Sequence, residues 1–285
     1  TVLTNLEAVP FGVDTFGTMR LVDPNALEVW GLPGLRIYDS ISALAQQVFL
    51  MLPFFLARIA LRSEQAIREI LIALVIAAGI YALPMLWEVR FSPQLHTRLY
   101  GFFQHDFAQA MRNGGFRPFV FMPHGLWVAF FAFMCTMAAA AMVREAESRA
   151  KLKRFLVVVG IFGLVVITKS MGALVFTVVF VPAVLLLKPR AHLAVSAMLV
   201  VVVLAYPLLR GSGAVPTAEL VAFVESFNEE RAQSLNYRFT NEDRILAHVE
   251  AKPLFGWGGW GRFMVYDPAT GRTQSIVDGQ WIITI

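Results

Sequence analysis

Apolar residues fill five long blocks of the chain, without the alternation that is typical of a half-exposed strand. The blocks cover about residues 41–60, 67–87, 119–143, 155–187 and 192–209. A helix needs roughly 20 apolar residues to cross the hydrocarbon core of a bilayer. The pattern therefore predicts an all-α fold, a multi-pass transmembrane helical bundle.

The block 155–187 is too long for one ordinary span, and the polar sequence Thr168-Lys169-Ser170-Met171-Gly172 interrupts it. Basic residues favour the cytoplasmic side, and one long helix would place Lys188 and Arg190 opposite the other basic links. We therefore predict two short helices here, about six spans in all, with Lys169 on the outer side. The basic residues of the three links are Arg58, Arg62, Arg68, Arg144, Arg149, Lys151, Lys153, Arg154, Lys188 and Arg190.

These spans divide the chain into parts with different expected locations. Residues 1–40 form an extracytoplasmic segment, and residues 41–209 form the bundle, with an outer loop at 88–118. Residues 210–280 form a large outer loop that contains short helices, and residues 281–285 begin a further span. We interpret the chain as part of a longer protein.

The large outer loop carries helical signals of its own. Apolar residues recur at helical spacing between 220 and 227, which predicts an amphipathic helix. Thr240 and Asp243 have the spacing of a capping box, so we expect a second short helix to begin there. Lys252-Pro253 is expected to end it, because proline cannot continue a helix.

The composition supports a membrane protein and argues against several classes of soluble protein. Hydrophobic residues make up 57% of the 285 residues, and charged residues 15%, against roughly 25% in soluble domains. The net charge of +4 fits basic loops beside anionic lipid, so we expect no nucleic-acid partner. The single cysteine excludes a disulfide within the chain, and no metal-ligand spacing or cofactor motif is present.

Two arginines outside the spans are the first candidates for a binding site. Arg117 lies in Asn113-Gly114-Gly115-Phe116-Arg117-Pro118, where glycines permit close backbone approach and a guanidinium suits phosphate. Arg238 precedes the helix expected after Thr240, whose N-terminus favours anions. Arg117 equally fits an arginine that extends to lipid headgroups, and Arg238 equally fits an ion pair with Glu242 or Asp243.

Other polar residues lie in the same outer parts. Lys169 is a third cation at the break, although a lysine at a span end is often only an anchor. His124 and the pair His105-Asp106 fit either a site or ordinary polar contacts. Asp278 fits either a base that accepts a proton from a hydroxyl or the cap of the following helix.

Three of these segments together resemble the O-antigen ligase and O-antigen polymerase superfamily. The first runs from Arg238 through Lys252-Pro253-Leu254-Phe255-Gly256-Trp257-Gly258, and it is similar to that family's arginine, helix and Pro-Leu-x-Gly-x-Gly turn. Residues 114–118, running into His124 and Gly125, resemble its other arginine motif, and residues 168–173 resemble its helix break. The resemblance covers most of the chain from about residue 40 onward.

The resemblance implies a metal-independent glycosyltransferase of the bacterial inner membrane, multi-pass and active at the periplasmic face. Its donor would be an undecaprenyl-diphosphate-linked saccharide, and its acceptor a saccharide or a lipid core, with no cofactor. The ligases of the family often have a histidine where this chain has Asp278, which favours a polymerase or an exopolysaccharide-type enzyme. We assign catalysis to Arg117, Arg238 and Asp278, and substrate binding to Arg112, His124, Lys169 and Arg244, with Arg117 and Arg238 meeting over one diphosphate.

Two other functions remain open from the residues alone. A carrier or flippase for lipid-linked saccharides would also need cations, although distributed along a path through the bundle. A non-enzymatic membrane assembly partner would use the outer loop as a docking surface, and single arginine substitutions would leave glycan transfer intact.

Overall fold

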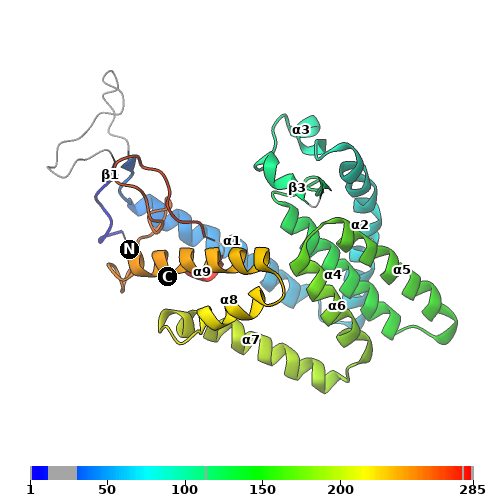
Figure 1. Cartoon of the computed structure of the whole chain (residues 1–285). Helices are drawn as coiled ribbons and strands as arrows, with labels where there is room; N and C mark the ends of the chain where they lie inside the picture. Colours follow the sequence, from blue (N-terminus) through cyan, green and yellow to red (C-terminus); the bar gives the residue numbers. More distant parts are fainter. Residues whose placement is uncertain (1, 12–30, 113, 278, 284–285) are drawn as a thin grey trace. The chain divides into compact units, whose positions relative to one another are not determined.

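The structure is a computed structural model that describes residues 2–11, 31–112, 114–277 and 279–283, and it is predominantly helical (Figure 1). The chain forms two compact units. One unit contains residues 55–197, and the other contains residues 1–54 and 198–285.

Within the described residues, four helices are long and apolar enough to cross a membrane: α1 (Ile37–Ala60), α2 (Glu64–Phe91), α4 (Gly125–Arg144) and α7 (Pro189–Gly211). The apolar windows of α1 and α7 contain no buried residue at all. A helix that is apolar all round and uncovered by protein requires lipid as its solvent. This confirms the predicted class, an all-α membrane protein with multiple apolar helices.

The core of the unit 55–197 is built around α4, which packs against α2, α5 (Ser148–Ile167) and α6 (Met171–Leu186). Half of the apolar window of α4 is buried. Its inner positions are mainly small residues, and these permit close approach of neighbouring helices. Among them are Ala129, Ala132, Cys135, Ala139 and Ala140.

The apolar block 155–187 is divided between α5 and α6, as the polar interruption predicted. α5 ends at Ile167 and α6 begins at Met171. Lys169, between them, has a φ of 52°, a left-handed backbone conformation that ends the first helix. The existence of two helices is confirmed, whereas the span count of about six and the sidedness stay predictions.

Short elements cover one end of this unit between α2 and α4. They are α3 (Leu95–Tyr100), the 3-10 helix η1 (Phe107–Ala110), and the two-stranded hairpin of β3 (Met111–Arg112) and β4 (Gly115–Phe116). The hairpin was not predicted, because each strand has only two residues and no apolar alternation. It matters here because it leads directly into Arg117.

The second unit contains β1 (Val9–Pro10) paired with β2 (Gly31–Leu32), together with α8 (Thr217–Glu225), α9 (Glu229–Val249) and α10 (Gln280–Ile283). The amphipathic helix expected between 220 and 227 is present as α8, which lies beside α9 (Figure 1). Ile245 and Val249 of α9 form a small core with Ile282.

The helix start expected at Thr240 is wrong. α9 is continuous from Glu229, and the side chain of Asn228 caps it by accepting the N–H of Arg231 at 2.9 Å. No glycine or proline interrupts residues 229–249, so the pattern at Thr240 lies in the helix interior. The expected stop before Pro253 is nearly correct, since α9 ends at Val249.

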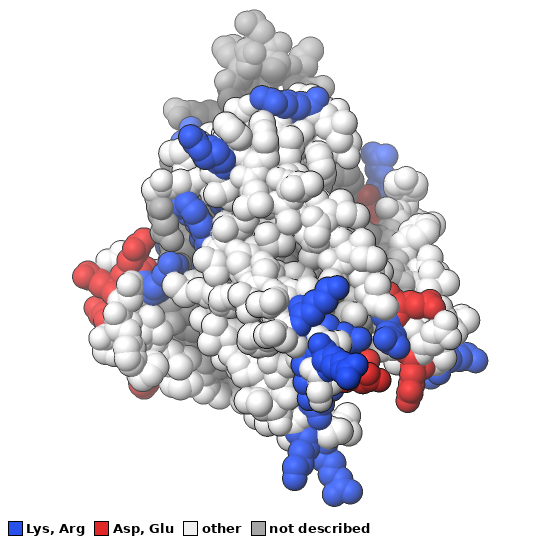
Figure 2. Space-filling model, turned by 90° about the vertical axis from the view of Figure 1, so that its right-hand side faces the viewer, with Lys and Arg blue, Asp and Glu red and all other residues white. Residues whose placement is uncertain are grey.

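Most of the surface in Figure 2 carries neither acidic nor basic side chains. Blue Lys and Arg groups gather mainly towards the lower end of that view. Large uncharged areas of this kind are typical of a protein whose surface contacts lipid tails.

Candidate functional site

Arg117, in the unit 55–197, has an unusual environment for a charged side chain. Its side chain is fully buried, and none of its guanidinium nitrogens has a hydrogen-bond partner among the described residues. The backbone fixes it in place, because its N–H donates to the carbonyl of Ala110 at 2.7 Å. A buried cation without hydrogen bonds is costly, so this side chain is poised for an anionic ligand.

The guanidinium lies against the N-terminal end of α4. A Cβ added at Gly125, the first residue of that helix, would lie 2.5 Å from Nε of Arg117. Only glycine leaves room for the arginine at this position. The positive end of the helix dipole and the guanidinium repel one another, and an anion between them would bind both.

The pKa of Arg117 indicates that burial of its charge costs free energy. Burial, followed by the charge of Arg112, lowers the pKa of Arg117 to about 10. That pKa still keeps the guanidinium positive at neutral pH. The site therefore has a full positive charge to offer an anion.

The hairpin also receives the lysine of the helix break. Lys169 donates from Nζ to the carbonyl oxygen of Arg112 at 2.8 Å. A Cβ at Gly115 would lie 2.6 Å from the same Nζ, so the close approach that this glycine permits is to Lys169. The structure thus brings Lys169, Arg112 and Arg117, from two distant segments, to one end of the unit.

His124 stands at the N-cap of α4, where its Nδ1 accepts the N–H of Leu126 at 3.0 Å. Its ring lies 4.6 Å from that of His105, centroid to centroid, in a T-shaped contact. Burial, followed by the charge of Arg117, lowers the pKa of His124. His124 therefore belongs to the same cluster as Arg117.

Glu88 positions this cluster, and the sequence analysis did not identify it. The buried carboxylate accepts N–H groups from Leu95, Phe119 and Val120, at 3.1, 2.8 and 2.7 Å. These bonds fix the segment that follows Arg117 to the end of α2. The carboxylate is occupied by backbone donors, and the described residues show no ion pair between it and Arg117.

Arg238 and Arg244 both lie on α9, in the other unit, and both are exposed. Arg244 donates to the carbonyl of Gln274 at 3.1 Å. Arg238 lies in the interior of α9, so the expected place ahead of a helix N-terminus is wrong. Asp278 lies outside the described residues, and the expectation that Arg117 and Arg238 share one diphosphate stays a prediction.

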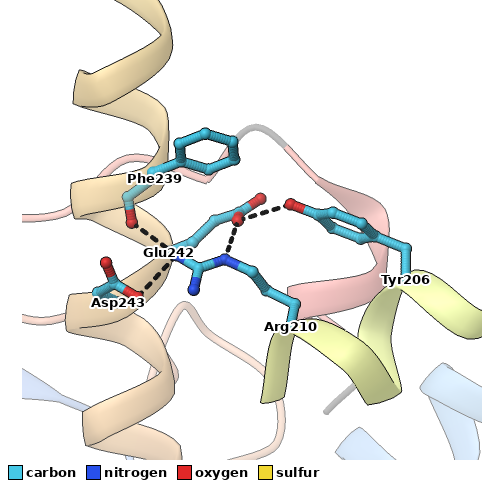
Figure 3. Close-up of polar contacts among 5 residues, drawn as sticks. All are labelled: Tyr206, Arg210, Phe239, Glu242 and Asp243. Carbon is cyan, nitrogen blue, oxygen red and sulfur yellow. Dashed lines mark hydrogen bonds and ion pairs between the residues drawn. The ribbon is translucent and has the colours of Figure 1, made fainter. Parts of the chain in front are cut away.

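The carboxylates considered as partners of Arg238 bind a different arginine. Arg210, at the end of α7, donates to Glu242 at 3.0 Å, to Asp243 at 2.6 Å and to the carbonyl of Phe239 at 3.2 Å (Figure 3). Tyr206 donates its hydroxyl to Glu242 at 2.9 Å. These contacts attach α9 to α7, and with them the part of α9 that carries Arg238.

The segment Gly256-Trp257-Gly258-Gly259-Trp260-Gly261, called the Gly/Trp turn below, follows α9 as irregular structure. Trp257 stacks on His248 with 4.0 Å between ring centroids and donates from Nε1 to the carbonyl of that histidine at 3.0 Å. Lys252 lies over the Trp257 ring and donates to the carbonyl of Thr4 and to Oδ1 of Asn5, both at 2.6 Å. The turn is thereby fixed to the N-terminal segment of the same unit.

The O-antigen ligase family matches residues 155–280, just under half of the chain. No curated protein and no solved structure matches. The matched range contains Lys169, Arg238 and Arg244, whereas Arg117 and His124 precede it. The matched range also contains the helix break, α9 and the Gly/Trp turn on which the resemblance rested. Residues 155–280 of this membrane protein are thus similar to the O-antigen ligase family.

Proposed function

We propose that the protein transfers a glycan from an undecaprenyl-diphosphate carrier to a saccharide or lipid-core acceptor at the periplasmic face of the bacterial inner membrane. Arg117 binds the diphosphate, and Arg238 contributes a second guanidinium. Arg112, Lys169 and His124 bind the substrate beside Arg117, and Arg244 does so on α9. The proposal needs neither a metal ion nor a nucleotide.

The single observation that carries the proposal is the buried guanidinium of Arg117 beside the N-terminus of α4, which has no hydrogen-bond partner among the residues that the structure describes. Guanidinium groups bind phosphate oxygens with two parallel hydrogen bonds, and helix N-termini add backbone donors. Arg112 and Lys169 add further positive charge nearby. Because the guanidinium is covered, an anion reaches it only after side chains above it shift.

The proposed chemistry is a displacement at the anomeric carbon. The acceptor hydroxyl forms a new C–O bond as the bond between the anomeric carbon and the diphosphate oxygen breaks, with inversion. The electron pair leaves with the diphosphate, whose growing charge the arginines stabilise. Asp278 is our proposed base for the hydroxyl proton.

An assay with the purified full-length protein and a lipid-linked oligosaccharide tests this function. Arg238→Ala is expected to lower transfer by at least about 100-fold, as expected for the loss of a charge-stabilising donor. Arg231→Ala, another exposed arginine of α9, is the matched control and should keep its activity. Activity retained by Arg238→Ala would remove this residue from the mechanism, and oligosaccharide movement without any product would favour a carrier.

Cysteine labelling is expected to show the proposed sidedness. Cys135 is the only cysteine and is buried among small residues, so Cys135→Ala provides the background. Thr240→Cys should react with a membrane-impermeant maleimide in intact spheroplasts. Lys188→Cys should react only after the membrane is opened. The reverse pattern would invert the topology and place the arginines at the cytoplasmic face.

A further inference from the structure

Two histidines at the end of α4 share one hydrogen-bond arrangement. His124 accepts the N–H of Leu126 on Nδ1 at 3.0 Å, and His105 accepts the N–H of Asp106 on Nδ1 at 2.7 Å. A ring nitrogen that accepts an N–H carries no proton of its own. When such a ring is neutral, its proton is therefore on Nε2.

For His124, the N-cap of α4 requires the tautomer with the proton on Nε2. Protonation on Nδ1 would direct two hydrogens at one another and remove the N-cap of α4. Burial and the charges of Arg117, His105 and Arg112, in that order, also disfavour the imidazolium by lowering the pKa of His124. The ring is thus a neutral imidazole whose Nε2–H has no partner among the described residues.

The ligand for this N–H is indicated by its surroundings. The buried guanidinium of Arg117 lies against Gly125, the residue next to His124, and has no partner in the described part of the chain. The nearby carboxylates are occupied. Glu88 accepts backbone N–H groups, and Asp106 accepts the N–H of Ala108 at 3.0 Å. The charge of Arg117 also acts on the His124 ring, so the two groups are near enough for us to expect one anion to contact both.

We propose that His124 is a neutral hydrogen-bond donor to the phosphate oxygens that Arg117 binds, acting through Nε2–H, and that it is not the base for the acceptor hydroxyl. This inference rests on the proposed function, because it takes the lipid diphosphate as the anion. In another enzyme, a neutral imidazole whose pKa is lowered by a helix N-terminus polarises a substrate carbonyl group. Acting as a base through Nε2 would require the proton to move to Nδ1 and break the cap.

Two substitutions separate the donor from the cap. In His124→Asn, the short amide caps the helix in place of Nδ1 but does not reach the position of Nε2. In His124→Gln, an amide N–H reaches the Nε2 position, whereas glutamine is a poor N-cap. Donation therefore predicts that Asn keeps the melting temperature but weakens binding of undecaprenyl diphosphate in nanodiscs, by about 10- to 100-fold.

The opposite result overturns the inference. If His124→Asn binds as tightly as the wild type and only His124→Gln loses stability, His124 serves α4 alone. His192→Asn is the control, because that ring contacts the carbonyl of Ala183 and should not affect binding. If the wild type does not bind the lipid diphosphate, the proposed function itself fails. If it binds and only Arg117→Met loses binding, only the inference on His124 fails.

The tautomer gives a readout that does not depend on activity. The ring of His124 is assigned in ¹⁵N-histidine-labelled protein by its absence from the spectrum of His124→Asn. The ¹⁵N shifts at neutral pH are expected to show a protonated Nε2 and an unprotonated Nδ1. An Nδ1–H tautomer or an imidazolium would contradict the proposed donor state.

Discussion

Arg117→Met is expected to abolish glycan transfer and, at the same time, to raise the melting temperature of the protein. The guanidinium is fully buried without a hydrogen bond to any described residue, and burial lowers its pKa to about 10, a shift that corresponds to a cost of roughly 3 kcal/mol. Methionine fills a similar volume without a charge. Replacement of buried charges by apolar residues often stabilises a protein by about 1–4 kcal/mol.

If Arg117 binds a ligand, Arg117→Met should lower the rate of glycan transfer while it raises the melting temperature. Transfer should fall by at least about 100-fold, as for the loss of a charge-stabilising donor. Arg112→Met, at an exposed neighbour, is the control and should not raise the melting temperature. If Arg117→Met instead lowers the melting temperature, the guanidinium is a structural element and the proposed site is wrong.

The stability of the protein is expected to rise as the pH increases in the alkaline range. Because burial lowers the pKa of folded Arg117 to about 10, the cost of its charge is fully present below that pH. That cost is relieved as the pH rises above about 10. Binding of an anion should weaken over the same rise, since the guanidinium loses its charge.

Arg210→Met is expected to lower the free energy of unfolding of the unit that contains α9 by about 3 kcal/mol. Removal of one partner from a buried ion pair leaves the other charge unpaired, at a cost of about 3–5 kcal/mol. We take the lower value because the side chain of Asp243 is 59% exposed and solvent screens its share. Glu242 is only 14% exposed, so it accounts for most of the effect.

A double-mutant cycle identifies the pair as the cause. Arg210→Met with Glu242→Met should recover most of the stability lost in the single variants, because no buried charge is then left alone. Tyr206→Phe is the milder comparison, since it removes one hydrogen bond worth about 1 kcal/mol. Additive losses in the double variant would show that the two residues stabilise the fold independently.

Long apolar blocks made the helices predictable from the sequence. Their extent requires spanning helices, and the polar interruption at Lys169 correctly marked the division between α5 and α6. The capping pattern at Thr240 failed because short motifs also occur within helices, where neighbouring helix-forming residues and packing against α8 outweigh them. Only the upstream cap at Asn228 marked the true start of α9.

The sequence predicted which residues belong to the candidate site better than it predicted how these residues are arranged. Glycines beside Arg117 indicated a close approach, and Lys169 and His124 do lie in the same cluster. The partners of Arg210 are 29–33 residues away in sequence, and Glu88 accepts only backbone N–H groups, so no local spacing predicts these contacts. The one sequence signal for Glu88 and Arg210 is that each is a charged residue near the end of an apolar helix, where lipid alone would not solvate the charge.

The hydrogen bond from Nζ of Lys169 to the carbonyl oxygen of Arg112 connects the hairpin to the α5–α6 junction. A single bond of this kind, with a charged donor, contributes about 1.5–3 kcal/mol and opens by thermal motion. We therefore expect that a ligand that moves the hairpin also frees the ammonium group of Lys169, so that entry of the ligand and release of this lysine occur together.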